Sequence, residues 1–150
     1  MKLFIYRIII AIALSIIWVS SAHNEYGYNY NFPKIYSLNL FPLLFWPLGL
    51  IAMYIVYAYF TRFIKKPNFK KNLLLFITLY WPLLILAEYI GYYFFNVHNL
   101  ATSMYSGLPI CHCMHAPAWM QFMYFAMGPV FLLICYTFKL ESKTEKIVDK

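Results

Sequence analysis

The segment 111–115, with sequence CHCMH, holds two cysteines and two histidines within five residues. Thiolate and imidazole are ligands that zinc and copper prefer, and a loop can fold such a short run around one ion. The Cys-x-Cys spacing is narrower than that of common zinc modules, and no second half-site follows it. The segment therefore predicts a copper or zinc site. The predicted ligands are Cys111, His112, Cys113, His115 and His98.

The same two cysteines suit other roles. Two thiols this close oxidise readily in an oxidising compartment. A reactive Cys111–Cys113 bridge would fit a thiol–disulfide oxidoreductase linked to a membrane quinone, whereas an inert bridge would only tighten the loop. The sequence leaves metal ligation, redox chemistry and a structural role open. Cys135 is expected to be a small buried apolar residue.

Glu88 is the single carboxylate within the apolar stretches of the chain. An ionisable group inside a membrane span is costly, and its presence indicates a functional site. We therefore predict Glu88 as the catalytic residue, which acts as a proton relay or as a hydrogen-bond partner that orients the metal ligands. The alternative is a neutral glutamate that ties two helices together through a tyrosine or Gln121.

The composition predicts an integral membrane protein. Of 150 residues, 63% are hydrophobic and 11% are charged, and the mean hydropathy is +0.63. A soluble domain of this size could not cover its surface with so few charges. Soluble enzymes and nucleic-acid-binding proteins are excluded, and the sequence contains neither a phosphate-binding glycine loop nor a Gly-x-Ser-x-Gly motif.

Four apolar runs are long enough to form membrane helices, which predicts an all-α bundle. The first, in residues 1–22, is either a transmembrane helix or a cleaved signal peptide, so the bundle has four helices or three. Residues 23–138 form the rest of the bundle, and residues 139–150 form a tail. The other three helices are predicted at 38–61, 73–95 and 118–138, with loops at 23–37, 62–72 and 96–117.

The positive charges predict the orientation. Eleven of the twelve basic residues lie near the amino terminus, in loop 62–72 or in the tail, and only Lys34 lies elsewhere. The positive-inside rule places those segments in the cytoplasm. The loops 23–37 and 96–117, which hold all four histidines, then face the periplasm of a bacterial inner membrane.

These observations predict a small multi-pass membrane protein with an outward-facing Cys/His cluster that binds copper or zinc for metal handling or membrane redox chemistry. The alternatives are the quinone-linked thiol–disulfide oxidoreductase and a non-catalytic accessory subunit of a membrane complex. The expected partners are the lipid bilayer and either another membrane protein or a second copy of the chain, with no nucleic acid.

Overall fold

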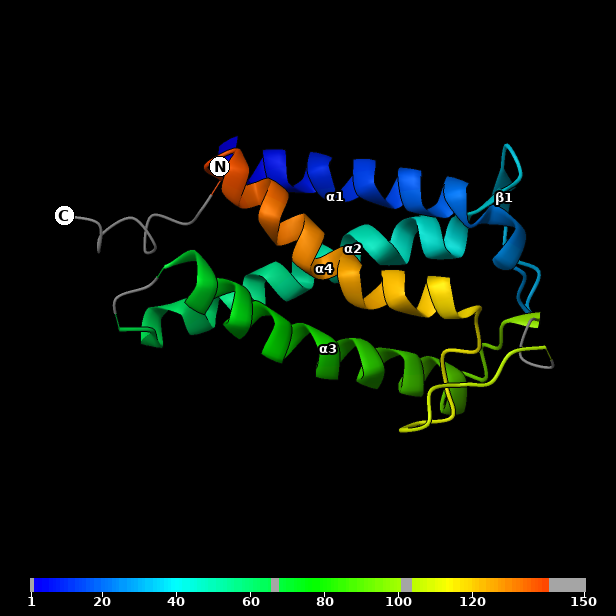
Figure 1. The fold of residues 1–150 in the computed structure, drawn as a ribbon. Helices are drawn as coiled ribbons and strands as arrows, with labels where there is room; N and C mark the ends of the chain where they lie inside the picture. Colours follow the sequence, from blue (N-terminus) through cyan, green and yellow to red (C-terminus); the bar gives the residue numbers. More distant parts are fainter. Residues whose placement is uncertain (1, 66–67, 101–103, 141–150) are drawn as a thin grey trace.

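The computed structural model describes residues 2–65, 68–100 and 104–140, which form four long helices and one short hairpin (Figure 1). The helices are α1 (Lys2–Ser21), α2 (Leu40–Phe60), α3 (Phe69–Tyr93) and α4 (Ala118–Thr137). Short 3-10 turns, η1 (His23–Glu25) and η2 (Thr61–Phe63), follow α1 and α2. Strands β1 (Lys34–Ile35) and β2 (Leu38–Asn39) pair antiparallel. Each of the four helices is long and apolar enough to cross a membrane, which confirms the predicted helical bundle.

Asparagine caps explain where two helices begin. The Asn68 side chain accepts a hydrogen bond from the backbone N–H of Lys71 at 2.9 Å, so α3 begins at Phe69, four residues before the predicted start at 73. The Asn39 side chain caps α2 in the same way, through the N–H of Phe41. Asn68 lies outside the predicted run 73–95, whereas Asn39 lies inside the predicted run 38–61, and α2 begins after it, at Leu40.

Successive helices run in opposite directions, so one end of the bundle carries the hairpin and the 94–117 connection (Figure 1). Helix α1 packs most extensively on α2, and α3 packs on α4. Helix α3 fully buries only Asn72, Phe76 and Tyr80. Other apolar side chains of α3, such as Leu79 and Leu84, are partly buried against the core, and a further set that includes Leu74 and Leu86 is exposed, as expected of a helix that faces lipid.

Helix α4 bends in its middle, at Pro129 (Figure 1). Proline has no N–H, so the carbonyl of Phe125, four residues earlier, has no helical donor. The indole N–H of Trp81 on α3 donates to that carbonyl at 3.2 Å. The preceding residue of α3, Tyr80, donates its hydroxyl to the carbonyl of Tyr124, the residue before Phe125, at 2.6 Å. The proline is thus accommodated by donors from the neighbouring helix.

Both ends of α1 are tied to the rest of the bundle. Near its start, the buried Arg7 guanidinium donates to the carbonyl of Leu140 and lies 4.3 Å from the ring centre of Tyr54. Near its end, the buried Trp18 indole donates to the Tyr26 hydroxyl at 2.5 Å. Residues 2–21 are therefore an integral helix of this four-helix structure. Cleavage after residue 22 stays a prediction, and tail residues 141–150 lie outside the described part.

The two loops predicted on the outer side meet at one end of the bundle. Tyr28 and Asn99 form an isolated antiparallel bridge. Beside it, the backbone N–H of Asn29 donates to the carbonyl of His98 at 2.9 Å, and the Asn29 side chain accepts from the N–H of His98 at 2.7 Å. These bonds join segments about seventy residues apart and hold His98 against the 23–37 loop.

Candidate functional site

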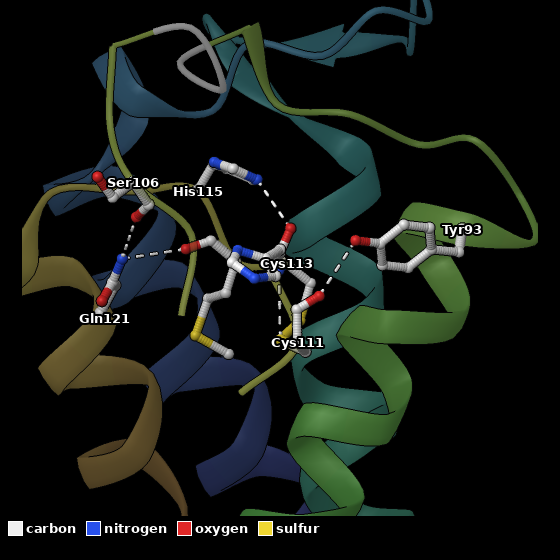
Figure 2. The surroundings of a disulfide bond; sticks show 8 residues. Tyr93, Ser106, Cys111, Cys113, His115 and Gln121 are labelled. Carbon is white, nitrogen blue, oxygen red and sulfur yellow. Dashed lines mark hydrogen bonds between the residues drawn. A yellow bond between two sulfur atoms is a disulfide. The ribbon is translucent and has the colours of Figure 1, made fainter. Parts of the chain in front are cut away.

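Cys111 and Cys113 form a disulfide in the loop that precedes α4 (Figure 2). Their Cα atoms are 5.1 Å apart, within the usual range for bridged cysteines. Cys135, near the other end of α4, is buried and takes no part in this bridge. The sequence left metal ligation, redox chemistry and a structural role open, and the structure shows the two cysteines bridged.

Backbone hydrogen bonds fold the chain tightly around the bridge. The N–H of Leu108 donates to the carbonyl of Cys113 at 2.8 Å, and the N–H of His112 donates back to the carbonyl of Leu108 at 2.8 Å. His112 and Met114, on either side of Cys113, have φ angles of 46° and 57°. Residues other than glycine rarely adopt this left-handed backbone conformation, so the loop stores backbone strain beside the buried cysteine.

Gly107 allows the close approach that this fold requires. A Cβ atom at Gly107 would lie 2.8 Å from the carbonyl carbon of His112 and 2.9 Å from the carbonyl oxygen of Cys113. These are backbone atoms, which cannot move as the end of a side chain can. Any residue larger than glycine would therefore force the two sides of the loop apart.

Two helices hold the loop from opposite sides (Figure 2). Tyr93, the last residue of α3, donates its hydroxyl to the carbonyl of Cys111 at 3.2 Å. On α4, the side-chain amide nitrogen of Gln121 lies 3.0–3.2 Å from the carbonyls of Ser106, Met114 and Ala116. The bridge is thus fixed relative to α3 and α4.

The two sulfur-bearing residues differ in access. The Cys113 side chain is 0% exposed, whereas Cys111 is half-buried. A reagent approaching from solvent therefore reaches Cys111 first. In thiol exchange, which sulfur is attacked depends on access, so this difference sets the direction of any reaction at the bridge.

The predicted histidines lie in two groups. The rings of His98 and His115 both stack on Tyr92, with centroid distances of 4.1 and 5.3 Å. Both ring nitrogens of His115 face backbone carbonyls, those of Tyr105 at 2.8 Å and His112 at 2.9 Å. Whichever tautomer is present, one nitrogen donates, which fixes the ring. His112 itself is exposed.

These positions do not form a metal site in the bridged state. Across residues 2–65, 68–100 and 104–140, no three side chains of His, Cys, Asp or Glu lie close enough together to hold one ion. The two cysteines are bonded to each other and present no thiolate. Both nitrogens of His115 are turned toward carbonyls. Ligation by the predicted set would require the bridge to open and His115 to turn.

Glu88 lies on α3, one turn before Tyr92, and is half-buried. Its carboxyl has no hydrogen bond or ion pair with any other described residue. The side chain of Gln121, which the sequence suggested as its partner, holds the 106–116 loop instead. Glu88 therefore lies one helical turn from Tyr92, the ring on which His98 and His115 stack, and makes no hydrogen bond to the described residues of the disulfide loop.

A buried phenol lies at the same end of the bundle. The Tyr26 hydroxyl accepts hydrogen bonds from the indoles of Trp18 and Trp46, at 2.5 and 3.0 Å. Burial strongly raises the pKa of Tyr26, hydrogen bonds from Tyr124 and the two indoles oppose that effect, and the charge of Glu88 adds to it. The Glu88 carboxyl is thus within electrostatic range of this aromatic cluster.

Gly107, Tyr93 and Gln121 support the site but do not stand out in the sequence as site residues. Their roles depend on which backbone groups the folded loop brings to them. For Gly107 the sequence offers one signal, a glycine next to a Leu-Pro pair before the cysteines, which is typical of a tight loop.

No protein-family model matches the chain, and neither the curated proteins nor the solved structures include a match.

Proposed function

We propose that this chain is a membrane thiol–disulfide oxidoreductase whose reactive group is the Cys111–Cys113 disulfide. The observation that carries the proposal is the bridge itself, held between α3 and α4 with one sulfur more accessible than the other. The left-handed backbone of His112 and Met114, on either side of the buried Cys113, is a second observation that supports a functional site.

The reaction follows from the difference in access. A substrate thiolate attacks the Cys111 sulfur, the bond between the two protein sulfurs breaks, and Cys113 leaves as a thiolate that takes up a proton. A second substrate thiol then attacks the substrate sulfur of the mixed disulfide and releases Cys111. The substrate dithiol becomes a disulfide, and the protein gains two electrons and two protons. A lipid-soluble quinone, which accepts two electrons and two protons, would restore the bridge.

Cysteine variants test this order of events. In Cys113→Ser, the remaining Cys111 thiol should react rapidly with maleimide, and it should form a mixed disulfide with a peptide whose single cysteine is activated as a 2-pyridyl disulfide, releasing 2-thiopyridone. In Cys111→Ser, the remaining Cys113 thiol should react slowly, because it is buried. The matched control is Cys135→Ser, which should oxidise one equivalent of dithiol peptide per chain, as the unmodified protein does. A Cys111–Cys113 pair that is unbridged in untreated membranes would refute the proposal.

Metal binding remains a second candidate, for the reduced protein. Reduction would release two thiolates beside His112, and the stacking of His98 and His115 on Tyr92 supports a convergence of imidazoles near them. We expect the reduced protein to bind about one copper(I) or zinc ion and the oxidised protein to bind none. Equal metal content in the Cys111→Ser/Cys113→Ser double variant and the unmodified protein would exclude this function.

We further propose that the disulfide loop faces the periplasm of a bacterial inner membrane. The proposal is supported by basic residues at the opposite end of the bundle, including Arg62, Lys65 and Lys139, while Lys34 lies in the hairpin at the loop end. In a chain without its native cysteines, a membrane-impermeant maleimide should label Ile110→Cys in intact spheroplasts. It should label Lys65→Cys only after lysis, and the reverse pattern would invert the topology.

A further inference from the structure

The end of the bundle opposite the disulfide loop carries an exposed basic side chain at each of the four helices (Figure 1). Each lies within two residues of the helix terminus at that end. The four residues, which we call the basic end, are Lys2 on α1, Arg62 after α2, Lys70 in the first turn of α3 and Lys139 after α4. Because all four helices contribute, the positive charge is spread over the whole end of the bundle.

No acidic side chain among the described residues balances this charge. Glu25 lies in η1 and Glu88 in the second half of α3, both toward the disulfide end. By sequence, the tail 141–150 holds three acidic and three basic residues, so it adds no net negative charge. The buried Arg7 adds a further positive charge, because its guanidinium donates to the backbone carbonyl of Leu140. The basic end is therefore complementary to an anionic surface.

Arg62 shows how one of these cations is oriented. Its guanidinium carbon lies 4.2 Å from the ring centre of Tyr59. Such a cation–π contact uses the face of the ring and involves no oxygen acceptor. The planar guanidinium can therefore still donate two parallel hydrogen bonds to a phosphate. Tyr59 thus holds Arg62 at the end of α2 without a competing carboxylate among the described residues.

The depth of the basic end matches that of lipid headgroups. The four helices are long and apolar enough to cross a membrane. A helix rises about 1.5 Å per residue, so cations within two residues of the termini lie within about 3 Å of the ends of the apolar helices. Tyr59, Phe63 and Phe138 lie at the same level and are 51%, 66% and 67% exposed. Aromatic side chains of membrane proteins gather at this interface, where headgroup phosphates also lie.

We propose that the basic end binds anionic phospholipid headgroups. The cations attract the phosphate, and the exposed aromatic side chains contact the apolar part of the same lipid, which a free phosphate ion lacks. At the other end of the bundle Lys34 is accompanied by Glu25, so the preference belongs to one leaflet. The inference goes beyond the proposed function, because it rests on the chain lying in a membrane and not on the chemistry of the bridge.

The test counts the lipids that stay bound to the full-length protein. The protein is placed in nanodiscs of equal parts phosphatidylglycerol and phosphatidylcholine, and native mass spectrometry measures the ratio of the two lipids retained after the nanodiscs are disrupted. The unmodified protein should retain phosphatidylglycerol in excess. One cation near an anionic membrane surface changes the affinity by about fivefold, so Arg62→Gln and Lys70→Gln should each lower the ratio by about that factor.

Two variants connect the preference to charge at this end. Lys34→Gln is the matched control, because it removes an exposed cation at the opposite end, and it should leave the ratio unchanged. Arg62→Lys keeps the charge and should retain most of the excess. If Arg62→Lys loses as much as Arg62→Gln, the Tyr59 contact and not the charge sets the ratio, and the inference fails.

Three other results would also overturn the inference. They are equal retention of the two lipids by the unmodified protein, an equal loss in Lys34→Gln and Arg62→Gln, and displacement of the retained lipid by inorganic phosphate, which would indicate a site for the free ion. None of them affects the proposed oxidoreductase, because dithiol oxidation at the Cys111–Cys113 bridge is measured separately and at the other end of the bundle.

Discussion

Replacing Gly107 with alanine should make the Cys111–Cys113 bridge easier to reduce. The new Cβ would lie 2.8 Å from the carbonyl carbon of His112, about 0.6 Å closer than the 3.4 Å at which ordinary contact begins. In the bridged loop that carbon lies between the two bonded cysteines and cannot retreat freely. Opening the bridge allows the segment to move, so the strain falls mainly on the oxidised form.

The magnitude follows from the cost of overpacking, which is about 1–3 kcal/mol for one added methyl group in a tight site. For a two-electron couple, that range corresponds to a rise in reduction potential of about 20–65 mV. The assay equilibrates the purified protein with graded ratios of reduced to oxidised dithiothreitol and counts alkylated cysteines by mass spectrometry.

Gly91→Ala is the matched control for this measurement. Gly91 lies in α3 near the loop, and a Cβ there meets no atom within 4 Å. The reduction potential of the bridge in Gly91→Ala should therefore equal that in the unmodified protein. A folded, bridged Gly107→Ala protein with an unchanged or lower potential would refute the reasoning. It would mean that the loop does not hold the two sides together as the structure describes.

Four further predictions concern the bundle. Gly128→Ala places a Cβ 2.7 Å from the ring of Tyr80 and should lower the free energy of unfolding by about 1–3 kcal/mol. Gly49→Ala, which meets no atom within 4 Å, should raise it by about 0.5–1 kcal/mol in the same denaturation assay. Because burial raises the pKa of Tyr26, the folded protein keeps that phenol neutral while the unfolded chain ionises. Stability should therefore be fully present below about pH 10 and fall as the pH rises further, with a shallower fall in Tyr26→Phe. Arg7→Met leaves a buried carbonyl after α4 without its charged donor and should cost about 1.5–3 kcal/mol of unfolding free energy, and an unchanged transition would contradict the α1 contacts.

The helices were predictable because a helix that can cross a membrane needs a long apolar run, and such a run is visible within one continuous stretch of sequence. The start of α3 was not, because Asn68 adds one capped turn before the apolar run begins. The junction of loops 23–37 and 96–117 also could not be predicted. Its bridge between Tyr28 and Asn99 depends on the register in which two distant segments meet.

The sequence indicated which residues lie at the candidate site but not whether the two cysteines are bridged. A Cys-x-Cys pair beside histidines can bind a metal, form a reactive bridge or form a structural bridge. The choice depends on where the loop backbone runs. Gln121 is the clearest example of a contact that the sequence could not predict. Its place on the last helix suggested a bond to Glu88, yet the loop brings three carbonyls within its reach instead.

The way the loop is held explains how a bridge could be both rigid and reactive. Tyr93 binds the carbonyl of Cys111, and Gln121 binds the carbonyl of Met114, so each helix holds one side of Cys113. Neither bond involves sulfur, and breaking the bridge leaves both in place. In the proposed reaction, the half-buried Cys111 sulfur would exchange with a substrate while the buried Cys113 sulfur stays close enough to close the ring again. That closure requires only a two-electron acceptor, and it returns the loop to the bridged form described above.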